Sequence, residues 1–190
     1  MSRFLAISAL SIFLLASPAS SASEGISDIV ITQGNNELVV SAQYKGGFTQ
    51  EIRKEIINGV SREFFYYIVL MKVMPNWLDE ENASKTIKYT VKYEILKNQF
   101  LVTKSAGEIK EEQIFDSYDE MVLWVSKIEK IILAPLKLLG KRDKYYVNIK
   151  AEMKGGELPF LLRYLLIFLP YSRFSTEWSH SKVFMLKDFR

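Results

Sequence analysis

The sequence predicts an α+β fold, with an antiparallel or mixed sheet and two to three helices packed on one face of it. Several segments alternate apolar and polar residues with a period of two, which is typical of strands with one solvent-exposed face. Short turn signals join some of these segments, and tight turns connect antiparallel strands. Between them lie stretches whose apolar residues recur every three or four positions, which indicates helices packed against the sheet.

The first 22 residues have the three-part pattern of a secretory signal peptide. A basic residue precedes an apolar run, Phe4 to Ala16, that is short for a transmembrane helix. Ser20 and Ala22 supply the small residues that a signal peptidase needs, so we expect cleavage after Ala22 and a single mature domain over residues 23–190. An uncleaved anchor is the alternative. The bacterial style of the signal favours the periplasm, with secretion as the other destination.

Composition excludes several kinds of site and partner. The 190-residue chain has no cysteine, so it has no disulfide framework, no disulfide-linked partner, no lipid-modified cysteine anchor and no cysteine-based zinc site. The formal net charge is +3 and the lysines are scattered among acids, so we expect no nucleic-acid partner. Hydrophobic residues make up 48% of the chain, which is enough for a globular core.

The first mature segments predict a β-hairpin, a short helix and a long strand. Two apolar-rich runs, 27–33 and 37–44, flank the turn Gly34-Asn35-Asn36. Thr49 is placed to cap a helix that ends at Asn58. The aromatic and β-branched run 62–74 predicts a strand buried on both faces, and a helix is the alternative for it.

The middle of the chain contains the clearest strand pattern. Residues 85–96 alternate, and the residues on the expected inner face are Ile87, Tyr89, Val91, Tyr93 and Ile95. A turn at Lys97-Asn98 leads to a partner strand over 99–104. The acidic stretch 108–112 is interpreted as a loop. Lys88 and Lys92 lie on the solvent-exposed face of this strand. Two interpretations of these lysines remain: a solvated surface that discourages sheet aggregation, or a weak basic stripe.

A capping box, Ser117 to Glu120, predicts the start of a second helix. Its expected apolar stripe extends that helix to about Ile132 and consists of Met121, Trp124, Val125, Ile128 and Ile132. Residues 144–153 alternate again and predict a strand. The segment Leu158 to Leu169, bracketed by Pro159 and Pro170, predicts a third helix.

No pattern in the chain indicates catalysis, a metal or a cofactor, and we predict none of these. The single histidine, His180, is interpreted as a surface or packing residue, because no nucleophile motif accompanies it. Carboxylates form three clusters without calcium-loop spacing, and we interpret them as solvated or helix-capping groups. The clusters are Asp79, Glu80 and Glu81; Glu108, Glu111 and Glu112; and Asp116, Asp119 and Glu120.

The predicted helix Leu158 to Leu169 is the candidate contact surface. It is apolar on nearly all sides, whereas a helix on a domain surface normally keeps a polar face. We therefore expect part of it to face a partner or a membrane surface, and a core helix or buried strand is the alternative. The candidate contact residues are Leu161, Arg163, Leu165, Phe168 and Leu169.

Several stretches together resemble a proteobacterial family of exported proteins known as domain of unknown function 4390. They are Leu38-Val-Val-Ser-Ala, Gly47-Phe-Thr-Gln-Glu-Ile, Ala83-Ser-Lys-Thr-Ile-Lys-Tyr-Thr-Val-Lys-Tyr, Leu133-Ala-Pro-Leu136, Tyr145-Tyr-Val-Asn-Ile-Lys-Ala-Glu, Leu158-Pro-Phe and Phe174 to Trp178. The resemblance covers essentially the whole mature chain. It implies an envelope location and one domain, and it carries no catalytic residue.

These observations lead to one main functional hypothesis. We expect a non-catalytic, membrane-associated protein of the cell envelope that acts by binding an envelope protein or a membrane surface. The alternative is a small-ligand carrier or a carboxylate-dependent periplasmic hydrolase. Two carboxylates facing each other across an apolar cleft would favour the alternative, and an exposed apolar patch would favour the binding protein.

Overall fold

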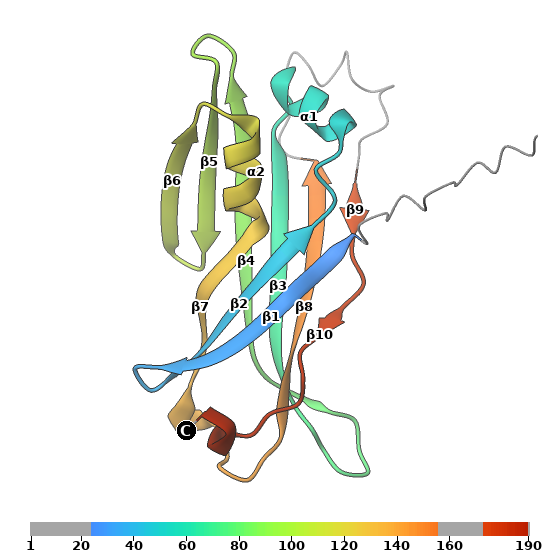
Figure 1. Ribbon diagram of the computed structural model, residues 1–190, viewed down its shortest axis with the longest axis vertical. Helices are drawn as coiled ribbons and strands as arrows, with labels where there is room; N and C mark the ends of the chain where they lie inside the picture. Colours follow the sequence, from blue (N-terminus) through green and yellow to red (C-terminus); the bar gives the residue numbers. More distant parts are fainter. Residues whose placement is uncertain (1–23, 156–172, 190) are drawn as a thin grey trace, which may run out of the picture.

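The computed structural model describes residues 24–155 and 173–189, which form two antiparallel sheets packed face to face (Figure 1). The smaller sheet has the order β1-β2-β7, with β1 (Gly25–Gly34), β2 (Glu37–Lys45) and β7 (Lys127–Pro135). The larger sheet has the order β10-β8-β3-β4-β5-β6, and β9 also pairs with β8. Its strands are β3 (Arg62–Lys72), β4 (Glu80–Glu94), β5 (Gln99–Ala106), β6 (Ile109–Phe115), β8 (Tyr145–Gly155), β9 (Phe174–Ser175) and β10 (Ser179–His180).

Short helices occupy the connections at the two ends of the sandwich. At one end, α1 (Gln50–Ile57) joins β2 to β3 and α2 (Tyr118–Ser126) precedes β7 (Figure 1). At the opposite end lie two 3-10 helices, η1 (Leu136–Leu138) and η2 (Leu186–Phe189). The predicted α+β architecture is therefore wrong, because the described chain is dominated by two sheets rather than by one sheet with helices covering a face.

Hairpin chemistry explains why the first predicted elements are confirmed. Asn35 and Asn36 form the two-residue turn between β1 and β2, and both have positive φ, at 48° and 62°. Asparagine tolerates this left-handed conformation, which the tight primed hairpin turns require. The helix predicted after Thr49 is also confirmed, since the Thr49 side chain accepts a hydrogen bond from the Ile52 backbone N–H at 3.4 Å.

The core lies between the facing surfaces of the sheets, and the alternating strands β4 and β8 supply it as predicted. On β4 the side chains of Ile87, Tyr89 and Val91 are buried, whereas Ile95, which was expected to follow them, lies beyond the strand and is 60% exposed. On β8 every second residue is buried: Tyr145, Val147, Ile149, Ala151 and Met153. Aromatic contacts join the two sheets, as between Tyr44 of β2 and Tyr66 of β3, whose ring centroids are 6.1 Å apart.

Several predictions about the remaining elements are wrong. The run starting at Arg62 is buried on one face and only half-buried on the other, so it is a sandwich strand rather than a fully covered one. The acidic stretch expected to be a loop is part of β6, a strand at the edge of the large sheet. Charged side chains suit such an edge, because they discourage pairing with other chains. The expected capping bond is missing as well, since Ser117 begins α2 without a side-chain hydrogen bond to the helix.

The second predicted helix ends at Ser126, well before Ile132, and the chain continues as β7. A bulge in β7 explains the error. Val40 and Ala42 of β2 pair with Ile131 and Ile128 of β7, so two residues of β7, Glu129 and Lys130, lie opposite the single residue Ser41 of β2. The buried residues Ile128 and Ile131 are therefore three apart, which resembles helical spacing, and Ile132 is 45% exposed.

Candidate binding groove

The predicted contact segment gives no site in the structure. Leu161, Arg163, Leu165, Phe168 and Leu169 lie outside the described residues. Among residues 24–155 and 173–189, no helix is both long and apolar enough to cross a membrane.

The carboxylate clusters make local contacts. Asp79 accepts hydrogen bonds from the Met74 backbone N–H at 3.1 Å and from the Tyr146 hydroxyl at 2.9 Å. Asp116 accepts one from the side chain of Gln99 at 3.1 Å, and Glu111 lies 4.0 Å from Lys104. In the part of the chain that is described, no group of three or more acidic or histidine side chains could hold a metal ion.

The single histidine lies on the surface, at β10. One ring nitrogen of His180 is 2.6 Å from the side-chain oxygen of Asn148 on β8, and the ring meets that of Tyr146 edge-on at 6.1 Å. These contacts fit the packing role expected for it. The lysine stripe of β4 is partly neutralised, because Lys88 forms a 3.1 Å ion pair with Glu63 of β3.

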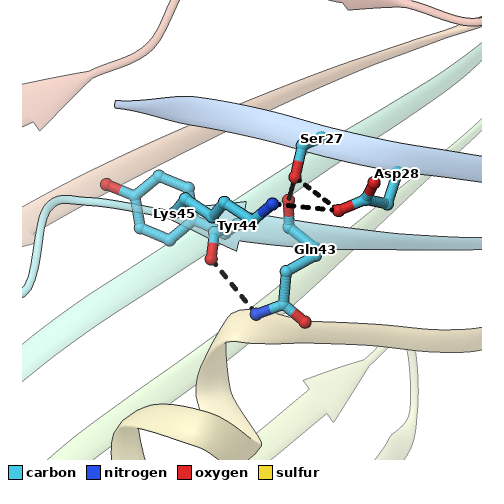
Figure 2. A network of polar contacts seen from close by, with 5 residues as sticks. All are labelled: Ser27, Asp28, Gln43, Tyr44 and Lys45. Atoms are coloured by element: carbon cyan, nitrogen blue, oxygen red, sulfur yellow. Dashed lines mark hydrogen bonds and ion pairs between the residues drawn. The ribbon is translucent and has the colours of Figure 1, made fainter. Parts of the chain in front are cut away.

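A polar network holds a bulge in β1, where Asp28 has a φ of 54° (Figure 2). Its carboxylate accepts hydrogen bonds from Ser27 at 2.8 Å and from Lys45 of β2 at 3.1 Å. The Ser27 bond and the Lys45 charge lower the pKa of Asp28. The bulge shifts the register between β1 and β2, and the network has the features of a structural joint rather than of a site.

A groove of about 920 Å³ is lined in part by residues of η1 and η2. Three segments line it: the β1–β2 turn, the segment after β7 and η2. The leucines of the last two segments, Leu136, Leu139 and Leu186, are called its floor. The lining residues are Gln33, Asn35, Asn36, Glu37, Pro135, Leu136, Lys137, Leu139, Lys141, Leu186 and Lys187.

Backbone hydrogen bonds fix the walls of this groove. The Leu136 N–H donates to the Asn36 carbonyl at 2.8 Å, which ties η1 to the hairpin turn. The C-terminal wall is anchored by a pair of bonds between Phe184 and Tyr145, at 2.8 and 2.9 Å. The Asp188 carboxylate accepts from the Met185 N–H at 2.7 Å and so holds η2 in shape. The groove is therefore built into the fold and does not depend on loop positions alone.

The groove combines an apolar floor with an excess of positive charge. Leu139 is buried, and Leu136 and Leu186 are half-buried. Lys137, Lys141 and Lys187 are exposed, and no carboxylate of a described residue lies within 4 Å of their ammonium groups. Glu37 is the one acid among the described lining residues. This arrangement can bind an anionic group beside an apolar one.

Exposed apolar side chains lie at the same end of the molecule. Leu138 of η1 is 66% exposed, and Trp77 and Leu78 in the β3–β4 connection are 81% and 83% exposed. The base of this connection is fixed to the segment before β8 by the 2.7 Å ion pair of Lys72 with Asp143. Figure 1 shows this connection, η1 and η2 together at one end of the sandwich.

A smaller cavity of about 290 Å³ lies between α2 and the β5–β6 hairpin. Glu120 and Glu129 line it together with the aromatic rings of Tyr89, Phe115 and Trp124. The ammonium group of Lys104 sits 5.9 Å from the Tyr89 ring and 5.8 Å from the Trp124 ring, within cation–π range. The cavity is therefore an aromatic recess with both signs of charge at its rim.

Sequence reasoning missed the main groove because three segments that are far apart in the sequence form it. The available signal was the stretch Leu136 to Lys141, which mixes leucines with two lysines directly after a proline. Nothing in the sequence showed that the β1–β2 turn and the C-terminal Lys187 would lie beside that stretch.

Comparison with curated proteins and with solved structures gives no match. A family model does match, over residues 22–182, and its description is Domain of unknown function (DUF4390). The match covers most of the chain and agrees with the resemblance found in the sequence. The chain therefore belongs to the DUF4390 family.

Proposed function

We propose that this protein is a non-catalytic binding protein of the cell envelope that associates with a membrane surface through its groove end. The observation that carries the proposal is the groove, in which three lysines without an ion-pair partner among the described residues border an apolar floor. The signal-like pattern of the first 22 residues supports a location in the periplasm.

The physical basis is the fit between this end and an anionic lipid surface. Each lysine near such a surface contributes about 1 kcal/mol of attraction, and the contribution falls with salt. Trp77 and Leu138 offer exposed apolar groups, and tryptophan favours the membrane–water interface. Glu80 and Glu81 follow the Trp77 loop, so we expect the lysine-bearing groove to lie closer to the lipid headgroups than that loop does.

The test is co-sedimentation of the purified chain, residues 23–190, with lipid vesicles. We expect binding to vesicles that contain phosphatidylglycerol, weaker binding to pure phosphatidylcholine vesicles, and loss of binding as salt rises. Lys137→Ala, Lys141→Ala and Lys187→Ala combined should remove most of the binding.

A matched control replaces three exposed lysines outside the groove: Lys54→Ala, Lys92→Ala and Lys110→Ala. These substitutions lower the net charge of the protein by the same amount as the groove variant does. The proposal requires this control to bind nearly as well as the unaltered chain. Equal loss in both triple variants, or no binding to anionic vesicles, would overturn it. An envelope protein would then be the remaining class of partner, and crosslinking in cells from the groove end would test it.

The smaller cavity supports a second candidate function, a small-ligand carrier or a carboxylate-dependent hydrolase. Glu120 and Glu129 both line an aromatic recess there, and two carboxylates beside aromatic walls favour that alternative. Glu120→Gln and Glu129→Gln combined should abolish the cellular role if this candidate is right. Under the membrane proposal the same variant keeps that role at normal protein level.

A further inference from the structure

We infer that the groove binds a single-chain amphiphile with an anionic head, whose chain lies on the leucine floor and whose head meets the lysines. This inference deepens the proposed membrane function by naming the class of molecule that the same site takes.

The dimensions favour a ligand with a chain over a simple anion. At about 920 Å³ the groove is near the upper end of the range for small-molecule sites, and it is far larger than a phosphate or carboxylate group needs. The apolar residues that line it are Pro135, Leu136, Leu139 and Leu186. Each methylene buried on such a surface raises affinity about fourfold, so a chain of several carbons contributes more than the head.

The charges of the lining residues favour a ligand with an anionic head. Lys137, Lys141 and Lys187 flank the leucines, and their long side chains can lie on apolar surface while the ammonium groups reach the head. Glu37, on the strand that follows the β1–β2 turn, also lines the groove next to its strand partner Pro135, and its carboxylate disfavours an anion near that point. We therefore expect an anionic head to lie beside the lysines and away from Glu37.

The experiment compares three probes that separate the head from the chain, with laurate kept below its micelle-forming concentration and dodecanol below its solubility limit. Laurate carries both, dodecanol carries the chain alone, and acetate carries the head alone. Calorimetry with the full mature chain should show laurate binding about tenfold tighter than dodecanol, as three exposed charge contacts predict, and no measurable acetate binding. The triple variant Lys137→Ala, Lys141→Ala and Lys187→Ala should bind laurate and dodecanol equally.

A photoactivatable laurate analogue on the unaltered chain locates the site and needs no variant to fold. We expect crosslinks in the segments Pro135–Lys141 and Leu186–Lys187. Crosslinks elsewhere, equal affinity for laurate and dodecanol, or no laurate binding would each overturn the inference. Vesicle binding without laurate binding would leave the proposed function standing and overturn the inference alone. Laurate binding in the groove without vesicle binding would support this inference and overturn the proposed membrane association.

Discussion

The hydroxyl of Tyr66 on β3 donates a 2.9 Å hydrogen bond to the backbone carbonyl of Val125, in the last turn of α2. Carbonyls in the last turn of a helix lack partners within the helix, so this bond satisfies one of them in the core. It also fixes the large sheet to the point where the chain leaves α2 and enters β7. The position of the small sheet over the large one depends in part on this contact.

Tyr66→Phe should therefore destabilise the protein by about 1 to 3 kcal/mol, because it leaves the Val125 carbonyl without its partner in a buried place. Urea unfolding measures the change. Tyr118→Phe is the matched control, since the buried Tyr118 hydroxyl has no hydrogen-bond partner among the described residues. That variant should be as stable as the parent or slightly more stable. Equal losses in the two variants would contradict the assignment.

Buried tyrosines should make the fold sensitive to alkaline pH. Burial raises the pKa of Tyr44, Tyr66 and Tyr89, and it raises that of Tyr118 to about 12. In the unfolded chain these groups ionise near pH 10, so stability is fully present below about pH 10 and falls as pH rises above it. Tyr66 alone contributes a slope of about 1.4 kcal/mol per pH unit.

Urea unfolding at a series of pH values from 8 to above 10 checks this expectation. Tyr66→Phe should make the decline shallower, because it removes one of the protons that the folded state holds more tightly. A stability that stays constant across this range would show that the tyrosines are not sequestered from solvent.

Local patterns predicted the paired strands well and the two-sheet architecture poorly. The β1–β2 turn is encoded by Asn35 and Asn36 themselves, and the alternation in β4 and β8 is short-range, so these elements could be read directly. The small sheet is completed by the pairing of β2 with β7, roughly ninety positions away in the sequence. The bulge in β7 gave its buried residues a spacing typical of a helix, so the strand was not predicted. Long-range pairing leaves no local signal.

The candidate groove was less predictable than the fold. Lys137 and Lys141 are near neighbours in sequence, but Lys187 and the β1–β2 turn reach them only through the folded topology. The acidic clusters were interpreted as non-catalytic because of their spacing, and their contacts, such as that of Asp79 with Tyr146, are local hydrogen bonds. The aromatic recess that contains Glu120 and Glu129 was not predicted, because only the folded topology brings Tyr89 and Lys104 beside α2 and the start of β7.

The bulge in β7 makes a specific prediction about Lys130, whose φ is 50°. A left-handed conformation costs a residue with a side chain about 1 kcal/mol relative to glycine. Lys130→Gly should therefore be neutral or stabilising, although glycine is normally unfavourable in a strand. Lys130→Val should be destabilising, because a β-branched side chain fits this conformation worst. Thermal unfolding of both variants decides the matter, and a less stable glycine variant would argue against the bulge.

Ser41 on β2 supports the same bulge, since its hydroxyl oxygen accepts a 3.1 Å hydrogen bond from the Lys130 backbone N–H. Ser41→Ala should cost about 0.5 to 1.5 kcal/mol. In the background of Lys130→Gly the two effects should not simply add, because both changes act on one backbone segment. Strict additivity in a double-mutant cycle would indicate that the hydrogen bond does not hold the bulge.

Arg62 at the start of β3 is buried, with 1% of its side chain exposed, and forms an ion pair with Glu55 of α1. Arg62→Met should destabilise the protein by about 3 kcal/mol, because it leaves the partly buried Glu55 carboxylate without this counter-charge. Arg53→Met, on the helix α1 that also carries Glu55, is the control. The Arg53 guanidinium lies 4.9 Å from the centre of the Tyr118 ring, and its loss should lower the free energy of unfolding by no more than about 1 kcal/mol.

The double variant Arg62→Met with Glu55→Gln separates the charge effect from the packing effect. Removing the carboxylate charge should recover part of the stability lost in Arg62→Met, since replacing both members of a buried pair is tolerated better than breaking it. Urea unfolding of the parent, the two single variants and the double variant gives the coupling energy. If the double variant is no more stable than Arg62→Met, the ion pair does not hold α1 against β3, and the loss comes from side-chain packing.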